Sequence, residues 1–71
     1  MFGFRTDSSA RLRAIMAELD INVSELAEKS GVSKTTISTL RHDSKRKPNT
    51  DTALLLARAL GVKTSSIWDD R

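Results

Sequence analysis

The sequence predicts a single compact all-α domain built from five short helices. Three observations predict this class. Apolar residues recur at helical spacing in several segments, residues that favour helix N-termini precede these segments, and glycines follow two of them. A chain of 71 residues has room for one small core and no second domain. We therefore expect residues 1–71 to form one domain, with residues 1–7 as an N-terminal arm.

The first helix is predicted to begin at Asp7-Ser8-Ser9, which offers good N-cap side chains. Four apolar residues then recur at positions i, i+3, i+4 and i+7, which places them on one side of a helix. Asp20 and Asn22 mark the break before the next element. The expected inward residues of this helix are Leu12, Ile15, Met16 and Leu19.

The second and third helices are predicted to be joined by a very short turn. Asn22 and Glu25 have the spacing of a capping box and open a helix that buries Leu26 and Ala27. A glycine at position 31 suits the left-handed conformation that closes a helix. Ser33 then provides a new N-cap for a third helix that runs to Arg41 or His42. So short a connection predicts a sharp change of direction between the two helices.

A loop and two further helices are predicted for the rest of the chain. Residues 43–49 contain no large apolar side chain except Pro48, which stops a helix from continuing through the segment. Asn49 or Thr50 can cap a fourth helix that ends before Gly61, and Thr64 can cap a last short helix carrying Ile67 and Trp68. The expected inward residues of the fourth helix are Ala53, Leu56, Ala57 and Leu60, with Leu54 and Leu55 outside this set.

The outward side of the third helix is unusual in composition. At 100° per residue, Thr36, Ile37 and Leu40 fall on one side of this helix and face the core. Ser and Thr are weak helix formers, so a solvated helix surface made of them is uncommon. Their hydroxyls can bond base edges in the major groove of DNA, although incidental surface residues remain an alternative interpretation. The outward residues are Lys34, Thr35, Ser38, Thr39 and His42.

Positive charge is concentrated in the same part of the chain. Residues 33–47 contain five basic residues and one acidic residue, a net charge of +4, whereas the whole chain carries +3. A cluster of this kind after a helix is suited to neutralising phosphate, and the alternative is a solvated basic loop. The basic residues that follow the polar helix side are Arg41, Lys45, Arg46 and Lys47.

Several functional classes find no support in the sequence. Cysteine is absent and histidine occurs once, so a zinc site has no ligand set and no metal or other cofactor is expected. No carboxylate pair, activated nucleophile or glycine-rich phosphate loop stands out, so an enzyme is not expected. No apolar run approaches the roughly 20 residues of a membrane span, and the first five residues are too short for a signal peptide. A cytoplasmic protein without a small-molecule substrate is the resulting expectation.

Three segments together resemble the Cro/C1-type (XRE-like) helix-turn-helix family of phage-repressor-like DNA-binding proteins. They are ELAEKSGVSKTTIS at 25–38, KRKP at 45–48 and LARALGV at 56–62, and the resemblance covers about residues 9–68. It implies a compact five-helix, lambda-repressor-like domain that is usually dimeric on double-stranded DNA. It also implies a helix-turn-helix in the second and third helices, with the third helix in the major groove. The base-contacting positions that it implies are Lys34, Thr35, Ser38 and Thr39, with phosphate contacts near Ser33 and in the loop after the third helix.

The chain departs from this family pattern at three places. Val23 stands where the family often has a glutamine that touches the DNA backbone, which puts that contact in doubt. Arg41 replaces a residue that is commonly acidic, and the loop at 44–47 is one residue longer than usual. The last two changes add charge or reach toward phosphate.

Other candidates have two interpretations each. His42 can bond a phosphate or favour the negative end of the helix dipole. Arg11, together with Arg5 and Arg13, is either a second phosphate-contacting group or a solvated helix start. The apolar residues Leu55, Ile67 and Trp68 are either core or a dimer contact.

These observations favour a prokaryotic or phage-encoded transcriptional regulator, expected to be a repressor that binds a palindromic operator as a homodimer. The two third helices would then meet half-sites roughly 34–36 Å apart. Alternatives are a DNA-binding antitoxin, the N-terminal fragment of a larger regulator, or a protein-interaction module.

Overall fold

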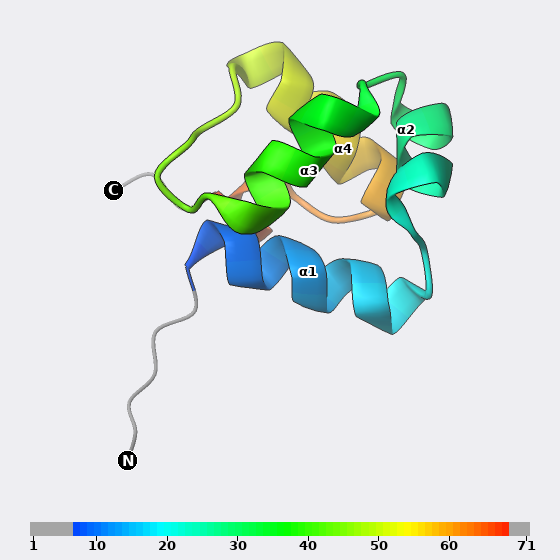
Figure 1. Cartoon of the computed structure of the whole chain (residues 1–71), viewed down its shortest axis with the longest axis horizontal. Helices are drawn as coiled ribbons and strands as arrows, with labels where there is room; N and C mark the ends of the chain where they lie inside the picture. Colours follow the sequence, from blue (N-terminus) through cyan, green and yellow to red (C-terminus); the bar gives the residue numbers. More distant parts are fainter. Residues whose placement is uncertain (1–6, 69–71) are drawn as a thin grey trace.

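The computed structural model describes residues 7–68 and confirms an all-helical fold. The four α-helices of this part are α1 (Ser8–Leu19), α2 (Val23–Ser30), α3 (Lys34–His42) and α4 (Thr50–Leu60). In Figure 1, α3 lies toward the viewer, α1 runs below it, α4 passes behind it and α2 lies at one end. The loop from α3 to α4 lies at the end of α3 away from α2.

Each α-helix begins where the sequence predicts, because a polar side chain accepts a backbone N–H of the first turn. The second helix has the full capping box, in which Asn22 Oδ1 accepts from Glu25 N at 2.8 Å and Glu25 Oε1 accepts from Asn22 N at 3.0 Å. The other three N-caps are Asp7, Ser33 and Asn49, which accept from the backbone N–H groups of Ala10, Thr36 and Thr52.

The ends of the helices fall into two kinds. Gly31 and Gly61 close α2 and α4 in the left-handed conformation, with φ of 80° and 74°. Asp20 closes α1 in the same way with φ of 56°, a conformation that aspartate tolerates better than most residues. After α3, by contrast, Asp43 has an extended backbone.

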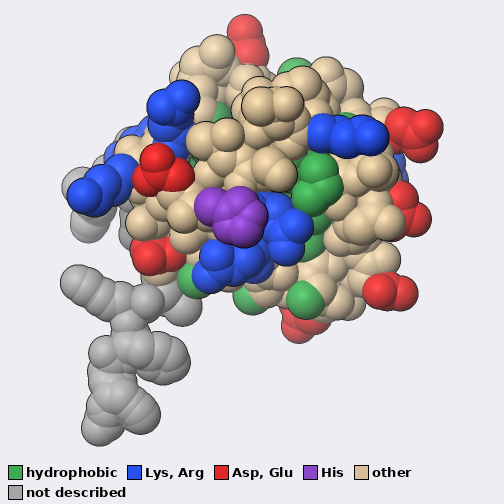
Figure 2. Space-filling model, in the orientation of Figure 1, with side chains coloured by type: hydrophobic (Ala, Val, Ile, Leu, Met, Phe, Trp, Pro, Cys, Tyr) green, Lys and Arg blue, Asp and Glu red, His purple; other side chains and the backbone are tan. Residues whose placement is uncertain are grey.

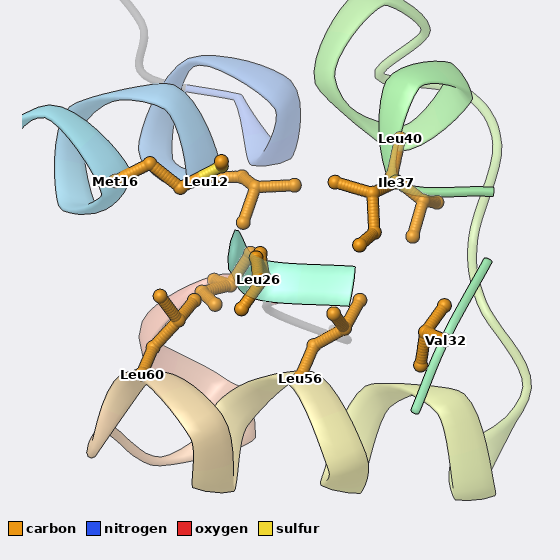
Figure 3. Packing of buried hydrophobic residues seen from close by; sticks show 9 residues of the cluster. Leu12, Met16, Leu26, Val32, Ile37, Leu40, Leu56 and Leu60 are labelled. Carbon is orange, nitrogen blue, oxygen red and sulfur yellow. The ribbon is translucent and has the colours of Figure 1, made fainter. Parts of the chain in front are cut away.

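One apolar core fills the space enclosed by the four helices. Leu26, Ile37 and Leu56 are fully buried and come from three different helices. Figure 3 shows them meeting the buried side chains of α1 and of the turn between α2 and α3. Burying a side chain of this size stabilises a fold by about 1.5–3 kcal/mol. The inward residues predicted for α4 are all confirmed as buried, namely Ala53, Leu56, Ala57 and Leu60.

The prediction of a fifth α-helix is wrong. Residues Thr64–Ser66 form a single 3₁₀ turn, preceded by Lys63, which makes no capping hydrogen bond with its side chain. Thr64 is therefore not an N-cap. The segment still serves the core, since Ile67 directly after it is fully buried.

The prediction of an inward Leu19 is also wrong. Leu12 and Met16 are buried and Ile15 packs against the core, but Leu19 is 52% exposed. Leu19 is the last residue of α1, and the chain turns away at Asp20. Ile21 packs against the core just beyond this turn.

No helix among residues 7–68 has the length and apolar character needed to cross a membrane.

Candidate nucleic-acid interface

The core fixes which side of α3 faces outward. Ile37 is 0% exposed and Leu40 is 3% exposed, so this side of the helix is held against α1, α2 and α4. On the opposite side Lys34, Thr35 and Ser38 are exposed. The two sides predicted from the sequence are confirmed for these residues, whereas Thr36, predicted to face the core, and Thr39, predicted to face outward, are both half-buried.

The hydroxyl groups near α3 differ in how far they are occupied by intramolecular bonds. Ser33 Oγ accepts from Thr36 N at 3.2 Å and donates to Thr36 Oγ1 at 2.9 Å. Thr39 Oγ1 donates to the carbonyl oxygen of Thr35 at 2.9 Å, which leaves its lone pairs to accept from a partner. Within residues 7–68, the hydroxyls of Thr35 and Ser38 have no hydrogen-bond partner, so both can donate and accept.

The turn before α3 is fixed by a buried serine. Ser30 Oγ donates to Leu26 O at 2.7 Å and accepts from Val32 N at 3.1 Å. Val32 is itself buried in the core. Only residues 31–33 separate the two helices, so this short, bonded turn determines where α3 starts.

The basic loop, defined as residues 43–49, begins directly at the C-terminal end of α3. Asp43 organises its first turn, because its Oδ1 accepts from Lys45 N at 3.0 Å and its carbonyl oxygen accepts from Arg46 N at 3.2 Å. Lys45, Arg46 and Lys47 are exposed. The backbone of the loop also approaches α1, since Ser8 Oγ donates to Ser44 O at 3.4 Å.

Charge surrounds the polar side of α3 in the folded chain. Figure 2 shows mostly uncharged surface over α3, with Lys and Arg side chains on either side of it. Most acidic side chains lie toward the edges of the same view. Such an arrangement presents hydrogen-bonding groups inside a positively charged border, which suits a polyanion.

The remaining predicted phosphate-contacting residues lie in different surroundings. His42 is exposed in the last turn of α3. Arg41 is half-buried, and its Nε is buried without a hydrogen-bond partner among residues 7–68. Arg11 is turned toward the C-terminal segment, where its guanidinium lies 3.5 Å from the carbonyl oxygen of Ile67.

The three apolar residues predicted as a dimer contact are not equivalent. Ile67 is fully buried, so the suggestion that its side chain contacts a second protomer is wrong. Leu55 is 43% exposed and Trp68 is half-buried. Leu54, which lies outside the predicted set, is 49% exposed and lines a hollow of about 290 Å³ together with Trp68 and Pro48.

One acidic group at the start of α1 is electrostatically perturbed. The pKa of Asp7 lies below its usual value, first because Ala10 N–H donates to the carboxylate and next because Ser9 does. The serine hydroxyl of Ser44 and the charge of Arg13 add to this lowering, while partial desolvation opposes it. Arg5, one of the predicted basic residues, lies outside the described residues.

Known proteins show where this arrangement has been seen before. No curated protein matches the sequence. Among solved structures, Streptomyces albus HEPD, with substrate 2-hydroxyethylphosphonate and Fe(II) bound, is similar with a TM-score of 0.80 and 28% sequence identity. The likeness covers 94% of this chain and only 15% of the HEPD chain. Among residues 7–68 there is no group of three His, Cys, Asp or Glu that could hold a metal ion.

The family comparison covers most of the chain. The helix-turn-helix family model HTH_3 matches residues 12–67, a span that runs from α1 to the residue after the 3₁₀ turn. It thus includes the fixed turn, the polar side of α3 and the basic loop. The chain belongs to the Cro/C1-type (XRE-like) helix-turn-helix family, whose members are DNA-binding transcription regulators.

Proposed function

We propose that this protein is a repressor that binds a palindromic operator as a homodimer, with one α3 in the major groove of each half-site. The observation that carries the proposal is the exposed hydroxyl side of α3, which is bordered by Lys and Arg side chains and backed by the buried Ile37 and Leu40. A helix can approach base edges closely when its inner side is held rigidly and its outer side chains are short.

Base recognition is assigned to the exposed residues of α3. Thr35 and Ser38 carry hydroxyls that have no hydrogen-bond partner among residues 7–68 and can donate and accept, and Thr39 retains the lone pairs of its hydroxyl oxygen. Lys34 adds a charged donor in the first turn, which can bond guanine O6 and N7.

Phosphate contact is assigned to residues at both ends of α3. Ser33 lies at its N-terminal end, where the helix dipole favours an anion. At the other end the charged side chains extend from the last turn into the basic loop. These residues are Arg41, His42, Lys45, Arg46 and Lys47, with Arg11 on α1 as an additional candidate.

Dimer formation is assigned to the exposed apolar residues of α4 and the C-terminal segment. Leu54 and Trp68 share one hollow, and Leu55 lies next in sequence to Leu54 on α4. In a two-fold dimer the same surface is contributed by both protomers, so a small self-complementary patch is used twice.

The sequence specificity can be tested in two steps. Duplexes are first selected from a random pool by the wild-type protein, and binding to the selected site and to a scrambled duplex is then compared by fluorescence anisotropy. Replacing Thr35 or Ser38 with alanine removes one hydrogen bond worth about 0.5–1.5 kcal/mol, and should lower the affinity ratio roughly two- to tenfold. Ser65→Ala, on an exposed serine outside α3, is the matched control. An unchanged ratio in the α3 variants would contradict the assignment of this surface.

The phosphate-contacting role of the basic loop has a different signature. Neutralising Lys45 or Arg46 with glutamine should weaken binding to both duplexes alike and reduce the slope of log K against log salt by about 0.9 per lost contact. Lys63→Gln, which removes one exposed charge outside the loop, should leave the slope unchanged. If the salt slope of the Lys45 and Arg46 variants equalled that of the wild-type protein, the phosphate contacts would have to be made by other residues.

A second candidate is that the chain acts as the DNA-binding part of a longer protein. The specific observation in favour is that the HEPD likeness covers only 15% of that chain. In this case the isolated domain would bind a half-site weakly as a monomer, and sedimentation of the protein–duplex complex would show one protomer per duplex.

A DNA-binding antitoxin would instead be a dimer on DNA, and would be recognised by a partner protein co-purifying with it. A protein-interaction module would bind no duplex in a salt-dependent manner.

A further inference from the structure

The C-terminal end of α3 is satisfied in a way that the other α-helices do not use. The residues that follow α1, α2 and α4 adopt the left-handed conformation and return a backbone N–H to the preceding turn. Asp43 after α3 is extended, and its N–H bonds the carbonyl oxygen of Thr39 in the ordinary helical pattern. In the following loop, the backbone N–H groups of Lys45 and Arg46 bond Asp43 and not the carbonyl oxygen of Arg41. This carbonyl belongs to the last turn, where helices need an outside donor.

The donor comes from another helix. A guanidinium N–H of Arg13 on α1 donates to the carbonyl oxygen of Arg41 at 2.8 Å. The bond is short, and the donor is charged, which makes it about twice as strong as a bond between neutral groups. The positive charge also lies at the negative end of the α3 dipole, which adds a favourable interaction.

Among the described residues, the Arg13 side chain makes this one hydrogen bond, and its charge also acts on Asp7 at the start of its own helix. The neighbouring arginine on α1 is directed elsewhere, since Arg11 approaches the carbonyl oxygen of Ile67 at 3.5 Å. Two arginines separated by one residue therefore serve two different segments of the chain. Within the described structure, the hydrogen-bond donors of Arg13 therefore serve the end of α3.

The position of Arg41 gives this contact its functional meaning. α3 has nine residues and carries the proposed base contacts in its first two turns. Its start is fixed by the bonded turn at residues 31–33, and Ile37 and Leu40 fix its inner side. A short helix held in these ways can still tilt about its buried side chains. A recognition group must be held within about 0.5 Å and 10–20° to work well, so a third attachment at the far end matters.

We propose that Arg13 is a positioning residue, which sets the orientation of α3 for base recognition through the carbonyl of Arg41 and does so without contacting DNA. This inference rests on the proposed DNA-binding function and names a specificity-determining residue outside α3. It differs from the sequence-based alternative, in which Arg13 belongs to a phosphate-contacting group.

The test uses the full chain and the duplex that the wild-type protein selects from a random pool, with a scrambled duplex for comparison. Arg13→Met keeps most of the apolar stem and removes the donors. Arg13→Lys keeps a charged donor on a shorter side chain. Arg58→Met, on an exposed arginine of α4, is the matched control for the loss of one charge. Binding is measured at several salt concentrations, at a temperature where circular dichroism shows all four proteins folded.

The expected result is a loss of discrimination without a loss of phosphate contacts. Arg13→Met should lower the ratio of selected-site to scrambled-site affinity roughly two- to tenfold, the range for one intramolecular hydrogen bond, and leave the salt slope at the wild-type value. Arg13→Lys should recover part of the ratio, and Arg58→Met should retain all of it.

Three results would overturn the inference. A salt slope reduced by about 0.9 in Arg13→Met, with both duplexes weakened alike, would make Arg13 a phosphate contact. A wild-type ratio in a less stable Arg13→Met would make its role structural only. If Arg13→Lys had as low a ratio of selected-site to scrambled-site affinity as Arg13→Met, the hydrogen bond would not be the cause of discrimination. If the wild-type protein binds no duplex, the proposed function fails as well, whereas discrimination retained in Arg13→Met overturns this inference alone.

Discussion

α3 and α4 both begin at a side chain that accepts a backbone N–H, Ser33 from Thr36 and Asn49 from Thr52. Both bury one apolar side in the same core. Their outer sides differ, because α3 exposes short hydroxyl groups and α4 exposes two leucines. The N-caps and the buried residues therefore stabilise each helix, and the residues of the outer side can differ according to what that side contacts.

The C-terminal ends of α3 and α4 also differ. α4 is closed locally by Gly61 with φ of 74°, whereas α3 ends in an extended residue and takes a donor from α1. α4 contains seven Ala and Leu residues, which are good helix formers, while α3 contains four Ser and Thr residues, which are poor ones. α3 therefore depends more on the rest of the fold than α4 does.

The largest expected effect tests whether the two helices contribute equally to the core. Ile37→Ala in α3 and Leu56→Ala in α4 each remove a side chain that is 0% exposed, and each should cost about 2–5 kcal/mol of unfolding free energy. Chemical denaturation followed by circular dichroism measures both. Arg58→Ala, on an exposed residue of α4 outside the proposed dimer contact, is the control and should change stability little. A small loss for Ile37→Ala alone would show that α3 is not held by the core.

A second prediction concerns the two N-caps. Ser33→Ala and Asn49→Ala should each cost about 1 kcal/mol, since each removes the acceptor for a first-turn N–H. Ser33→Ala should cost the more if α3 has the weaker intrinsic helix. Threonine at position 33 retains an acceptor and should restore most of the stability. Equal losses at both caps would contradict the proposed difference between the helices.

A third prediction separates stability from recognition. The double variant Thr35→Ala with Ser38→Ala should stabilise the fold by up to about 0.7 kcal/mol per residue, because alanine is the better helix former and both side chains are exposed. The same variant should lose discrimination between selected and scrambled duplexes. Thermal unfolding and anisotropy on the same samples measure the two effects. A variant that lost stability as well would indicate that these hydroxyls serve the fold.

The smallest expected effect concerns the pH dependence at the start of α1. The folded pKa of Asp7 is lowered, first by the Ala10 N–H, so its contribution is present above the unfolded value of 3.8. It is lost as the pH falls through the lower folded pKa. Asp7→Asn keeps an acceptor for the cap and should flatten the stability profile only in this acidic range. Unfolding curves between neutral pH and pH 3 would detect it, and an equal flattening near pH 7 would assign the effect to another group.

The helical elements were predictable because their signals are local. An N-cap, an apolar period and a closing glycine lie within one segment, and the caps at Asn22 and Ser33 were confirmed at those residues. The outward side of α3 was predictable for the same reason. Ile37 and Leu40 lie on one side of the helix at helical spacing, so their burial leaves the residues of the opposite side exposed.

The errors arose where tertiary contacts decide the outcome. Leu19 fits the period of α1, but its helix ends there and Ile21 takes the place against the core. The segment after Gly61 is too short to establish a period, so neither the 3₁₀ turn nor the burial of Ile67 could be inferred from spacing. The bond from Arg13 to Arg41 joins residues 28 positions apart, and the basic side chain alone gave no sign of its partner.

The contacts of α1 with the C-terminal segment bring the two limits of the described domain together. Asp7 and Ser8 line one small hollow with Ile67 and Trp68, and Arg11 reaches the carbonyl oxygen of Ile67. A chain that enters a domain and leaves it at neighbouring points can be placed inside another protein with little strain on its host. The proximity of these two ends makes the domain geometrically suited to insertion into a longer chain.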